Sequence, residues 1–200
     1  MIRNLLFDFG DVFINLDKTI VLEKMASFGL SEITPALSDL MNNYEMGLLT
    51  SEKFIAEIQN HFPKAEVNEI TSAWNSIILD FPEYRLEFLE KLKVTGKYRL
   101  FLLSNTNDLH IEKVKEVMGL EKWQRFRKCF KKFYLSQQIH LRKPSAAIYK
   151  YVLEENDLTA QETLFIDDTE ENIAAASKLN IATWHLKVGA EDVINLKQKL

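Results

Sequence analysis

The stretch Leu5-Leu6-Phe7-Asp8-Phe9-Gly10-Asp11-Val12 organises the rest of the chain. Leu5 to Phe7 form a short apolar run that is typical of a buried strand, and an acid follows it at once. In a sheet buried on both faces, polar residues come where a strand ends. We therefore expect Asp8 at the carboxyl end of the first strand, facing the crevice where open α/β sheets bind ligands. Taken alone, Asp8 is equally consistent with a simple cap of a turn or helix.

The bulk composition is that of a globular protein with a well-filled core. The 200 residues are 46% hydrophobic and 11% aromatic, which argues against disorder and fits one large domain or a core with an inserted subdomain. A net charge of −4 argues against nucleic acid as the main partner. No apolar run approaches the roughly 20 residues that span a bilayer. The single Cys129 excludes an internal disulfide, so we expect a soluble cytoplasmic protein without a signal peptide.

The segment from about residue 17 to about residue 80 carries helical patterns and no convincing strand. Apolar residues recur there at helical spacing in four stretches. Pro35 falls in the first turn of one of them, where proline is tolerated. The four expected helices are one that Asp17 caps and that runs to about residue 27, and three more at 31–43, from 50 to just before Pro63, and at 67–77.

Beyond Pro82 the pattern changes to strands that alternate with helices. We expect strands at 98–103, 133–135, 163–166 and 181–186, and helices at 84–93, 108–118, 145–155, 172–179 and over the last ten residues. Residues 120–132 mix aromatic and basic side chains, which we interpret as a solvated face beside buried aromatics. The alternation predicts an α/β fold with a parallel sheet. We expect a Rossmann-like three-layer α/β/α core (1–13 and 84–200) with an inserted helical-bundle cap (14–83).

Polar groups appear at the end of one apolar strand after another. Asp8 follows the first strand, Ser104-Asn105 the second, and Asp167-Asp168 a later one, while Lys143 stands just before a helix. Each has an ordinary structural explanation, such as a turn, a helix cap or a surface lysine. Because parallel strands bring their carboxyl ends to one edge of a sheet, these groups are expected to meet in one crevice.

The chemistry of such a site follows from its charge. Three crowded carboxylates repel one another unless a cation binds, and ligation by oxygen alone suits Mg²⁺. A site with Mg²⁺, a lysine, and hydroxyl or amide donors is suited to a dianionic phosphoryl group. One carboxylate can then attack phosphorus and form an aspartyl-phosphate, which divides hydrolysis into two steps.

The motifs, taken as a set, resemble those of the haloacid dehalogenase-like hydrolase superfamily, in the subgroup with a helical cap inserted after the first strand. The matching segments, in order, are Phe7-Asp8-Phe9-Gly10-Asp11-Val12, Leu103-Ser104-Asn105, Arg142-Lys143-Pro144, and Phe165-Ile166-Asp167-Asp168 with Asn172. The resemblance covers essentially the whole chain. It implies a hydrolase that acts on a small phosphate ester.

The resemblance also implies a role for each matching residue. Asp8 is expected to be the nucleophile and to hold Mg²⁺ together with the Gly10 backbone carbonyl and Asp167, with Asp168 supporting the metal directly or through water. Ser104 and the Asn105 backbone are expected to bind the phosphoryl group, and Lys143 to neutralise nucleophile and phosphate. In the cap, the turn Glu45-Met46-Gly47 is expected to face the substrate.

The first motif departs from the usual phosphatase pattern at Gly10. Phosphatases of this superfamily usually carry a second Asp there, as general acid for the leaving group and base for water. Losing a general acid can cost about 10²–10⁴ in rate. Asp11 is one residue further on, and we expect its side chain to point elsewhere. The Asp-x-Gly pattern resembles a branch that includes phosphatases of sugar phosphates.

Three functions compete on this pattern. The first is an Mg²⁺-dependent phosphatase of a small phosphorylated metabolite. The second is a haloacid dehalogenase, whose relatives also lack the second Asp but need no metal, so the pair Asp167-Asp168 argues against it. The third is a non-catalytic phosphate-binding protein on the same scaffold, which the retained nucleophile, lysine and metal carboxylates disfavour. The substrate and the oligomeric state stay open.

Overall fold

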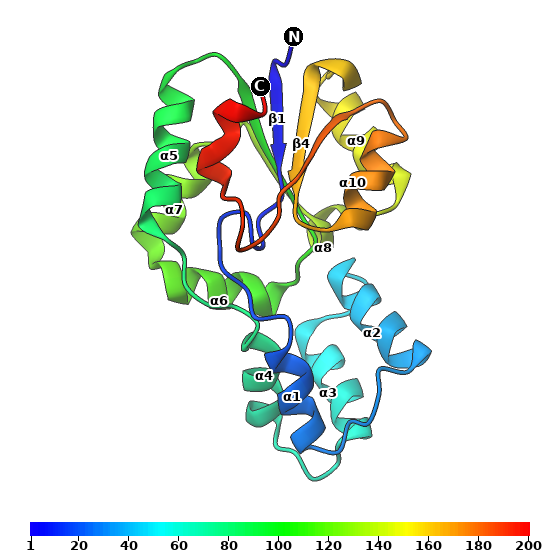
Figure 1. Ribbon diagram of the computed structural model, residues 1–200. Helices are drawn as coiled ribbons and strands as arrows, with labels where there is room; N and C mark the ends of the chain where they lie inside the picture. Colours follow the sequence, from blue (N-terminus) through cyan, green and yellow to red (C-terminus); the bar gives the residue numbers. More distant parts are fainter.

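A five-stranded, fully parallel sheet forms the centre of the molecule in the computed structural model, which describes all 200 residues (Figure 1). The strand order is β3-β2-β1-β4-β5. The strands are β1 (Asn4–Phe7), β2 (Arg99–Ser104), β3 (Lys132–Leu135), β4 (Thr163–Asp167) and β5 (Ala182–His185). Leu6 is in register with Phe101 of β2 and with Phe165 of β4, so the first strand is the middle one. The predicted α/β fold is confirmed.

Helices cover both faces of the sheet (Figure 1). One face carries α5 (Glu83–Val94), α6 (Asp108–Met118), α7 (Leu120–Lys128) and a 3₁₀ helix at Val193–Gln198. The other face carries α9 (Ala146–Glu155) and α10 (Glu170–Ser177). Side chains of β1 alternate between the two cores, with Leu5 and Phe7 in the first and Leu6 in the second. An apolar run without polar interruption is therefore what this central strand requires.

Four helices form a separate bundle beyond the carboxyl ends of the strands (Figure 1). They are α1 (Ile20–Ser27), α2 (Pro35–Glu45), α3 (Ser51–His61) and α4 (Val67–Asn75), and they enclose a hydrophobic cluster of their own. Tyr44 stacks on Phe54 with ring centroids 4.1 Å apart, and Trp74 lies 4.8 Å from Phe54. None of the helices in the molecule has the length and apolar composition that a membrane crossing requires.

Two linkers that run side by side connect this bundle to the rest of the chain. Asn15 N donates to Asp80 O at 2.9 Å, and Asp17 N donates to Ile77 O at 2.9 Å. Leu79 N in turn donates to Asn15 O at 3.0 Å. The linkers are thus hydrogen-bonded to each other, which fixes where the bundle stands over the strand ends.

The structure differs from the expected elements in several places. The helix α7 and the one-turn helix α8 (Ser136–Ile139) were not predicted, although the aromatic residues of α7, Trp123 and Phe126, are buried as expected. The first helix of the bundle begins at Ile20, a little later than expected, and Asp17 stands before it and accepts hydrogen bonds from the Thr19 and Ile20 amides, in agreement with the capping role expected for it. The last ten residues contain a 3₁₀ helix, whose buried Val193 and Leu196 follow its three-residue period.

Candidate active site

The polar groups that end the central strands meet at the edge of the sheet that faces the helical bundle. Asp8 follows β1 directly, and its backbone N–H donates to Ile166 O of β4 at 2.8 Å. Ser104 is the last residue of β2, and Asp167 is the last residue of β4. The parallel register therefore brings together groups that lie far apart in the sequence, as the strand-end pattern predicts.

Lys143 lies at the centre of this group. Its Nζ is 2.7 Å from Asp8 Oδ1 and 2.7 Å from Asp167 Oδ2, and its side chain is almost completely buried. The ammonium also lies 5.4 Å from the centre of the Phe165 ring. A buried lysine is tolerated only when its charge is paired, and here two carboxylates pair it.

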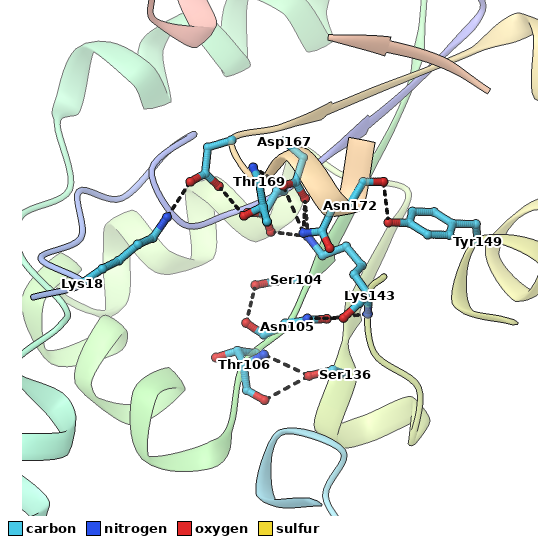
Figure 2. A network of polar contacts seen from close by, with 12 residues as sticks. Lys18, Ser104, Asn105, Thr106, Ser136, Lys143, Tyr149, Asp167, Thr169 and Asn172 are labelled. Atoms are coloured by element: carbon cyan, nitrogen blue, oxygen red, sulfur yellow. Dashed lines mark hydrogen bonds and ion pairs between the residues drawn. The ribbon is translucent and has the colours of Figure 1, made fainter. Parts of the chain in front are cut away.

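Asp167 has its carboxylate fixed on every side. Asn172 Nδ2 lies 3.1 Å from each carboxylate oxygen, and the Thr169 backbone N–H donates to Oδ1 at 2.8 Å. Tyr149 donates its hydroxyl hydrogen to the carbonyl of Asn172 at 3.0 Å (Figure 2). These bonds orient Asp167 before any ligand arrives.

Asp8, Asp167 and Asp168 each offer a carboxylate oxygen within 4.8 Å of the others. The trio is paired with only two ammonium groups, Lys143 and Lys18, so one negative charge is left over. Hard oxygen ligands with surplus negative charge are what Mg²⁺ prefers. The residues present therefore fit a magnesium ion, and Gly10, which the sequence also assigned to the metal, lines the same cavity as Asp8 and Asp168.

The pKa values of Asp8 and Lys143 also fit a site that binds a cation. Burial raises the pKa of Asp8 to about 7, because the nearby Lys143 offsets the loss of solvent only in part. Burial alone would lower the pKa of Lys143, but the charges of Asp167 and Asp8 outweigh it and raise that pKa. Lys143 is thus charged at neutral pH, and a further cation beside Asp8 would favour the ionised form of its carboxyl group.

Ser104 and Asn105 stand beside this group and line the same cavity. Ser104 is 3% exposed, and its hydroxyl makes only a long 3.4 Å contact with Asn105 O, which leaves it available to a ligand. The Asn105 side chain is committed elsewhere, since it bonds both the amide and the carbonyl of Lys143. Of Asn105, only the backbone is left to contact a phosphoryl group.

A cavity of about 320 Å³ opens between the strand ends and the helical bundle. Core residues on its wall include Asp8, Ser104, Lys143 and Asp168. The bundle and its linkers contribute Leu16, Lys18, Glu45, Ile77 and Ile78. The volume is that of a small-molecule site, with the charged groups gathered on the side of the sheet.

The turn Glu45-Met46-Gly47 attaches the bundle to the core. Glu45 Oε2 accepts from Arg142 Nε at 3.1 Å and from Arg142 Nη2 at 2.8 Å. Ser136 Oγ donates to Glu45 O at 2.6 Å, and the ring Nδ1 of His140 lies 2.8 Å from Met46 O. Only Glu45 of this turn lines the cavity. Gly47 instead packs against the backbone of Gln137.

The sequence alone does not mark two further residues of this site, Leu16 and Lys18. A Cβ built on Gly10 would lie 2.6 Å from Leu16 Cδ1, so an aliphatic side chain fills the place beside this glycine. Lys18 Nζ lies 2.5 Å from Asp168 Oδ2 and 2.9 Å from Asp11 Oδ2. No periodicity marks either residue, because both depend on how the first linker folds back over the strand end.

A family model for haloacid dehalogenase-like hydrolases matches residues 5–180. The chain belongs to this family. That span includes every site residue described above, from Asp8 to Asn172.

Several known proteins are similar over nearly the whole chain. D-ribitol-5-phosphate phosphatase of Bacteroides thetaiotaomicron is 24% identical over 197 residues, which is 96% of this chain and 95% of the relative. A HAD family enzyme of the same organism, solved with magnesium and inorganic phosphate, is 34% identical with a TM-score of 0.78 over 96% of this chain and 97% of its own. A predicted HAD-like hydrolase of Porphyromonas gingivalis is 27% identical with a TM-score of 0.82, over 100% and 97% of the two chains.

The fold is also that of dehalogenases. A dehalogenase structure aligns with a TM-score of 0.60 at 18% identity, over 98% of this chain and 89% of its own. At that identity the likeness extends to the fold alone. The choice between phosphatase and dehalogenase therefore depends on the residues of the site.

Proposed function

We propose that the protein is a magnesium-dependent phosphatase that hydrolyses a small phosphorylated metabolite, a sugar or polyol phosphate, through an aspartyl-phosphate on Asp8. The observation that carries this proposal is the buried Lys143 ammonium between Asp8 and Asp167, in a trio of carboxylates that opens into a cavity. A dehalogenase has no use for the surplus negative charge of such a trio, whereas a divalent cation neutralises it.

Each residue of the site has a part in the first step. The Asp8 carboxylate attacks phosphorus, the bond from phosphorus to the ester oxygen breaks, and the electron pair stays on that oxygen. We expect Lys143, the Ser104 hydroxyl and the Asn105 backbone N–H to bind the phosphoryl oxygens, where negative charge concentrates in the transition state. Magnesium, held by Asp8, Asp167, Asp168 and the Gly10 carbonyl, would supply further charge stabilisation at the phosphoryl group.

In the second step, water attacks the phosphorus of the aspartyl-phosphate. The acyl-phosphate bond breaks, Asp8 regains its carboxylate, and inorganic phosphate leaves. The Lys143 ammonium pairs with the restored Asp8 carboxylate, since its Nζ lies 2.7 Å from Asp8 Oδ1. Gly10 has no side chain that could take a proton from the water, so this proton passes to solvent or to the phosphoryl group itself.

The substrate class is supported by the size and chemistry of the cavity. A cavity volume of about 320 Å³ lies at the small end of the range for ligand pockets, which suits a small phosphate ester. Glu45, Lys18 and Arg142 supply polar atoms for hydroxyl groups on the wall away from the sheet. A polyol phosphate is also the substrate in the name of the similar Bacteroides thetaiotaomicron phosphatase.

We further propose that residues 1–13 and 84–200 act as the catalytic core and residues 14–83 as a cap over it. Support comes from the separate hydrophobic cluster within the four helices, Met25 to Trp74, and from the linkers paired at Asn15 and Asp80. The enzyme is expected in the cytoplasm, where phosphorylated metabolites and reduced thiols such as Cys129 are found.

Phosphate release from D-ribitol 5-phosphate, glucose 1-phosphate and p-nitrophenyl phosphate tests the proposal. We expect turnover with Mg²⁺, none after chelation, and none in Asp8→Asn with Mg²⁺. Halide release from a 2-haloacid without metal would overturn it in favour of a dehalogenase. Phosphate binding without hydrolysis of any ester in a wider screen of phosphorylated metabolites would overturn it in favour of a binding protein.

A further inference from the structure

The place of the missing acid is filled by an aliphatic side chain. A Cβ on Gly10 would lie 2.6 Å from Leu16 Cδ1, so Leu16 occupies the space that a side chain at position 10 would enter. An alkyl leaving group departs as a strongly basic oxygen, and its developing charge raises the barrier unless a donor contacts it. The donor that stabilises the leaving-group oxygen must therefore belong to another residue on the wall of the cavity.

On the cap side of the cavity, Lys18 is the one cation. The inserted segment and its linkers contribute Leu16, Ile77 and Ile78, which cannot donate a hydrogen bond, together with Glu45 and Lys18. Glu45 is an acceptor, and it is already paired with Arg142. Among the core donors on the wall, Ser104, Asn105 and Lys143 are assigned above to the phosphoryl oxygens. The side chains of Arg142, Thr169 and Asn172 also line the cavity, and they already donate to Glu45, Asp168 and Asp167 in turn.

Two carboxylates hold Lys18, and one of them, Asp168, belongs to the carboxylate trio of the site. Its Nζ contacts Asp168 Oδ2 at 2.5 Å and Asp11 Oδ2 at 2.9 Å, while half of the side chain is open to the cavity and solvent. Asp11 is itself fixed, because it is 8% exposed and its Oδ1 accepts from Leu16 N at 3.0 Å. In the view of Figure 2, Lys18 enters the network from the side opposite Lys143.

Asp11 and Asp168 differ in what a metal would do to them. Asp168 belongs to the carboxylate trio, so a divalent cation competes with Lys18 for its charge. Asp11 lies outside the trio and continues to hold the ammonium beside Gly10. The Lys18 ammonium has three N–H bonds and two carboxylate partners, so at least one N–H is left to point at a substrate.

Resting on the proposed function, we propose that Lys18 is a catalytic residue that donates a hydrogen bond to the leaving-group oxygen and replaces the acid absent at Gly10. As Asp8 bonds to phosphorus, the electron pair of the broken ester bond stays on the alkoxide oxygen, which the Lys18 ammonium stabilises while keeping its own proton. A water molecule protonates the alkoxide, and the hydroxide so formed passes to the solvent. Lys18 therefore matters most for poor leaving groups, such as those of sugar and polyol phosphates.

A comparison of two leaving groups tests this role. Wild-type protein, Lys18→Met and Lys18→Arg are assayed with Mg²⁺ on D-ribitol 5-phosphate, whose leaving group is an alkoxide, and on p-nitrophenyl phosphate, whose leaving group needs no donor. We expect Lys18→Met to lower kcat on the alkyl ester by about 10²–10³, the cost of removing one such donor, and on the aryl ester by less than tenfold. Lys18→Arg is expected to recover most of the alkyl activity.

The control variant is Lys53→Met, which removes an exposed cap lysine outside the cavity and is expected to change neither rate. Equal losses on both esters in Lys18→Met, or no loss on either, would overturn the inference. Calorimetric titration of each metal-free protein with Mg²⁺ checks that Lys18→Met still binds the metal, so that a lost metal site is recognised as such. If the wild type hydrolyses neither these two esters nor any other in the wider screen, it is the proposed function that fails.

Discussion

Asn105 grips the backbone of Lys143 from both sides. Its Nδ2 donates to Lys143 O at 2.9 Å, and its Oδ1 accepts from Lys143 N at 2.9 Å. The side-chain amide of Asn105, the residue after β2, therefore fixes the backbone of Lys143, whose Nζ must reach Asp8 and Asp167 together. The sequence assigned Asn105 to phosphate binding, and the structure gives its side chain this second task.

The substitution Asn105→Ala tests whether these two hydrogen bonds position Lys143. Removing both bonds releases the Lys143 backbone, and a misplacement of about 1 Å in a catalytic group can cost about 10² in rate. We expect kcat/KM to fall by about that factor, measured by steady-state phosphate release with saturating Mg²⁺. Asn156→Ala is the matched control, because its side chain bonds Val152 O and Tyr134 far from the cavity. Wild-type kinetics in Asn105→Ala would contradict the role.

Gly47→Ala tests how the cap rests on the core. A Cβ at position 47 would lie 2.1 Å from Gln137 O, and the residue has a φ of 66°. We expect the turn to lift away from α8, with a loss of more than about 1 kcal/mol in the free energy of unfolding and a raised KM for substrate. Urea denaturation and steady-state kinetics measure the two effects.

Gly29→Ala is the comparison, since Gly29 also has a positive φ of 106° but a Cβ there would meet nothing within 4 Å. Gly29→Ala therefore introduces backbone strain from the positive φ, but no steric clash like that between a Cβ at position 47 and Gln137. If both variants lose the same stability and neither changes KM, the cap does not depend on the contact with Gln137.

Gly10→Asp with Leu16→Ala tests the place of the missing acid. Gly10→Asp alone forces Leu16 to move, because the new Cβ would approach Leu16 Cδ1 within 2.6 Å. Trimming Leu16 makes room, so we expect the double variant to hydrolyse D-ribitol 5-phosphate faster than Leu16→Ala, by up to the 10²–10⁴ that general acid catalysis supplies. Rates on p-nitrophenyl phosphate are expected to change little. A double variant no faster than Leu16→Ala on the alkyl ester would show that proton supply does not limit the rate.

His110 gives the protein a pH-dependent stability. Burial lowers the pKa of this imidazole to about 4, with Nδ1 accepting from Asn107 Nδ2 at 3.0 Å and Nε2 donating to Trp74 O at 3.1 Å. In the unfolded chain the pKa is about 6.5, so the unfolded state binds more protons between these values. Stability is therefore complete above about pH 6.5 and is lost as the pH falls toward 4.

The loss of stability is at most about 3.5 kcal/mol, since the pKa falls from 6.5 to about 4 and each pKa unit is worth about 1.4 kcal/mol. Urea denaturation across pH 4–7 measures it in the wild type and in His110→Gln. We expect the difference between the two stability curves to narrow as the pH falls. Parallel curves would mean that His110 does not titrate on unfolding.

Much of the site could be predicted from the sequence because the end of a buried strand is visible as a change from apolar to polar residues. An apolar run followed by an acid needs no tertiary information, and it located Asp8, Ser104 and Asp167. Leu16 and Lys18 could not be found in this way. Their positions come from the linker that folds back across the strand end, where Asp11 takes a φ of 55°.

The helix α7 was missed for a similar reason. Its sequence is dominated by basic residues, and its buried side chains are only Trp123 and Phe126, too few to set a period. Phe126 is nonetheless packed within 5.1 Å of both the Phe9 and Phe13 rings. The helix α7 is stabilised by packing against a segment far away in the sequence, and such packing is not visible in the local spacing of apolar residues.

The aspartyl-phosphate on Asp8 is the central claim, and it can be detected directly. Protein turning over p-nitrophenyl phosphate with Mg²⁺ is quenched in acid, digested and analysed by peptide mass spectrometry. We expect one added phosphoryl group on the peptide that contains Asp8, and none in Asp8→Asn or after chelation of the metal. Phosphate release without a modified Asp8, or turnover that persists in Asp8→Asn, would contradict the account.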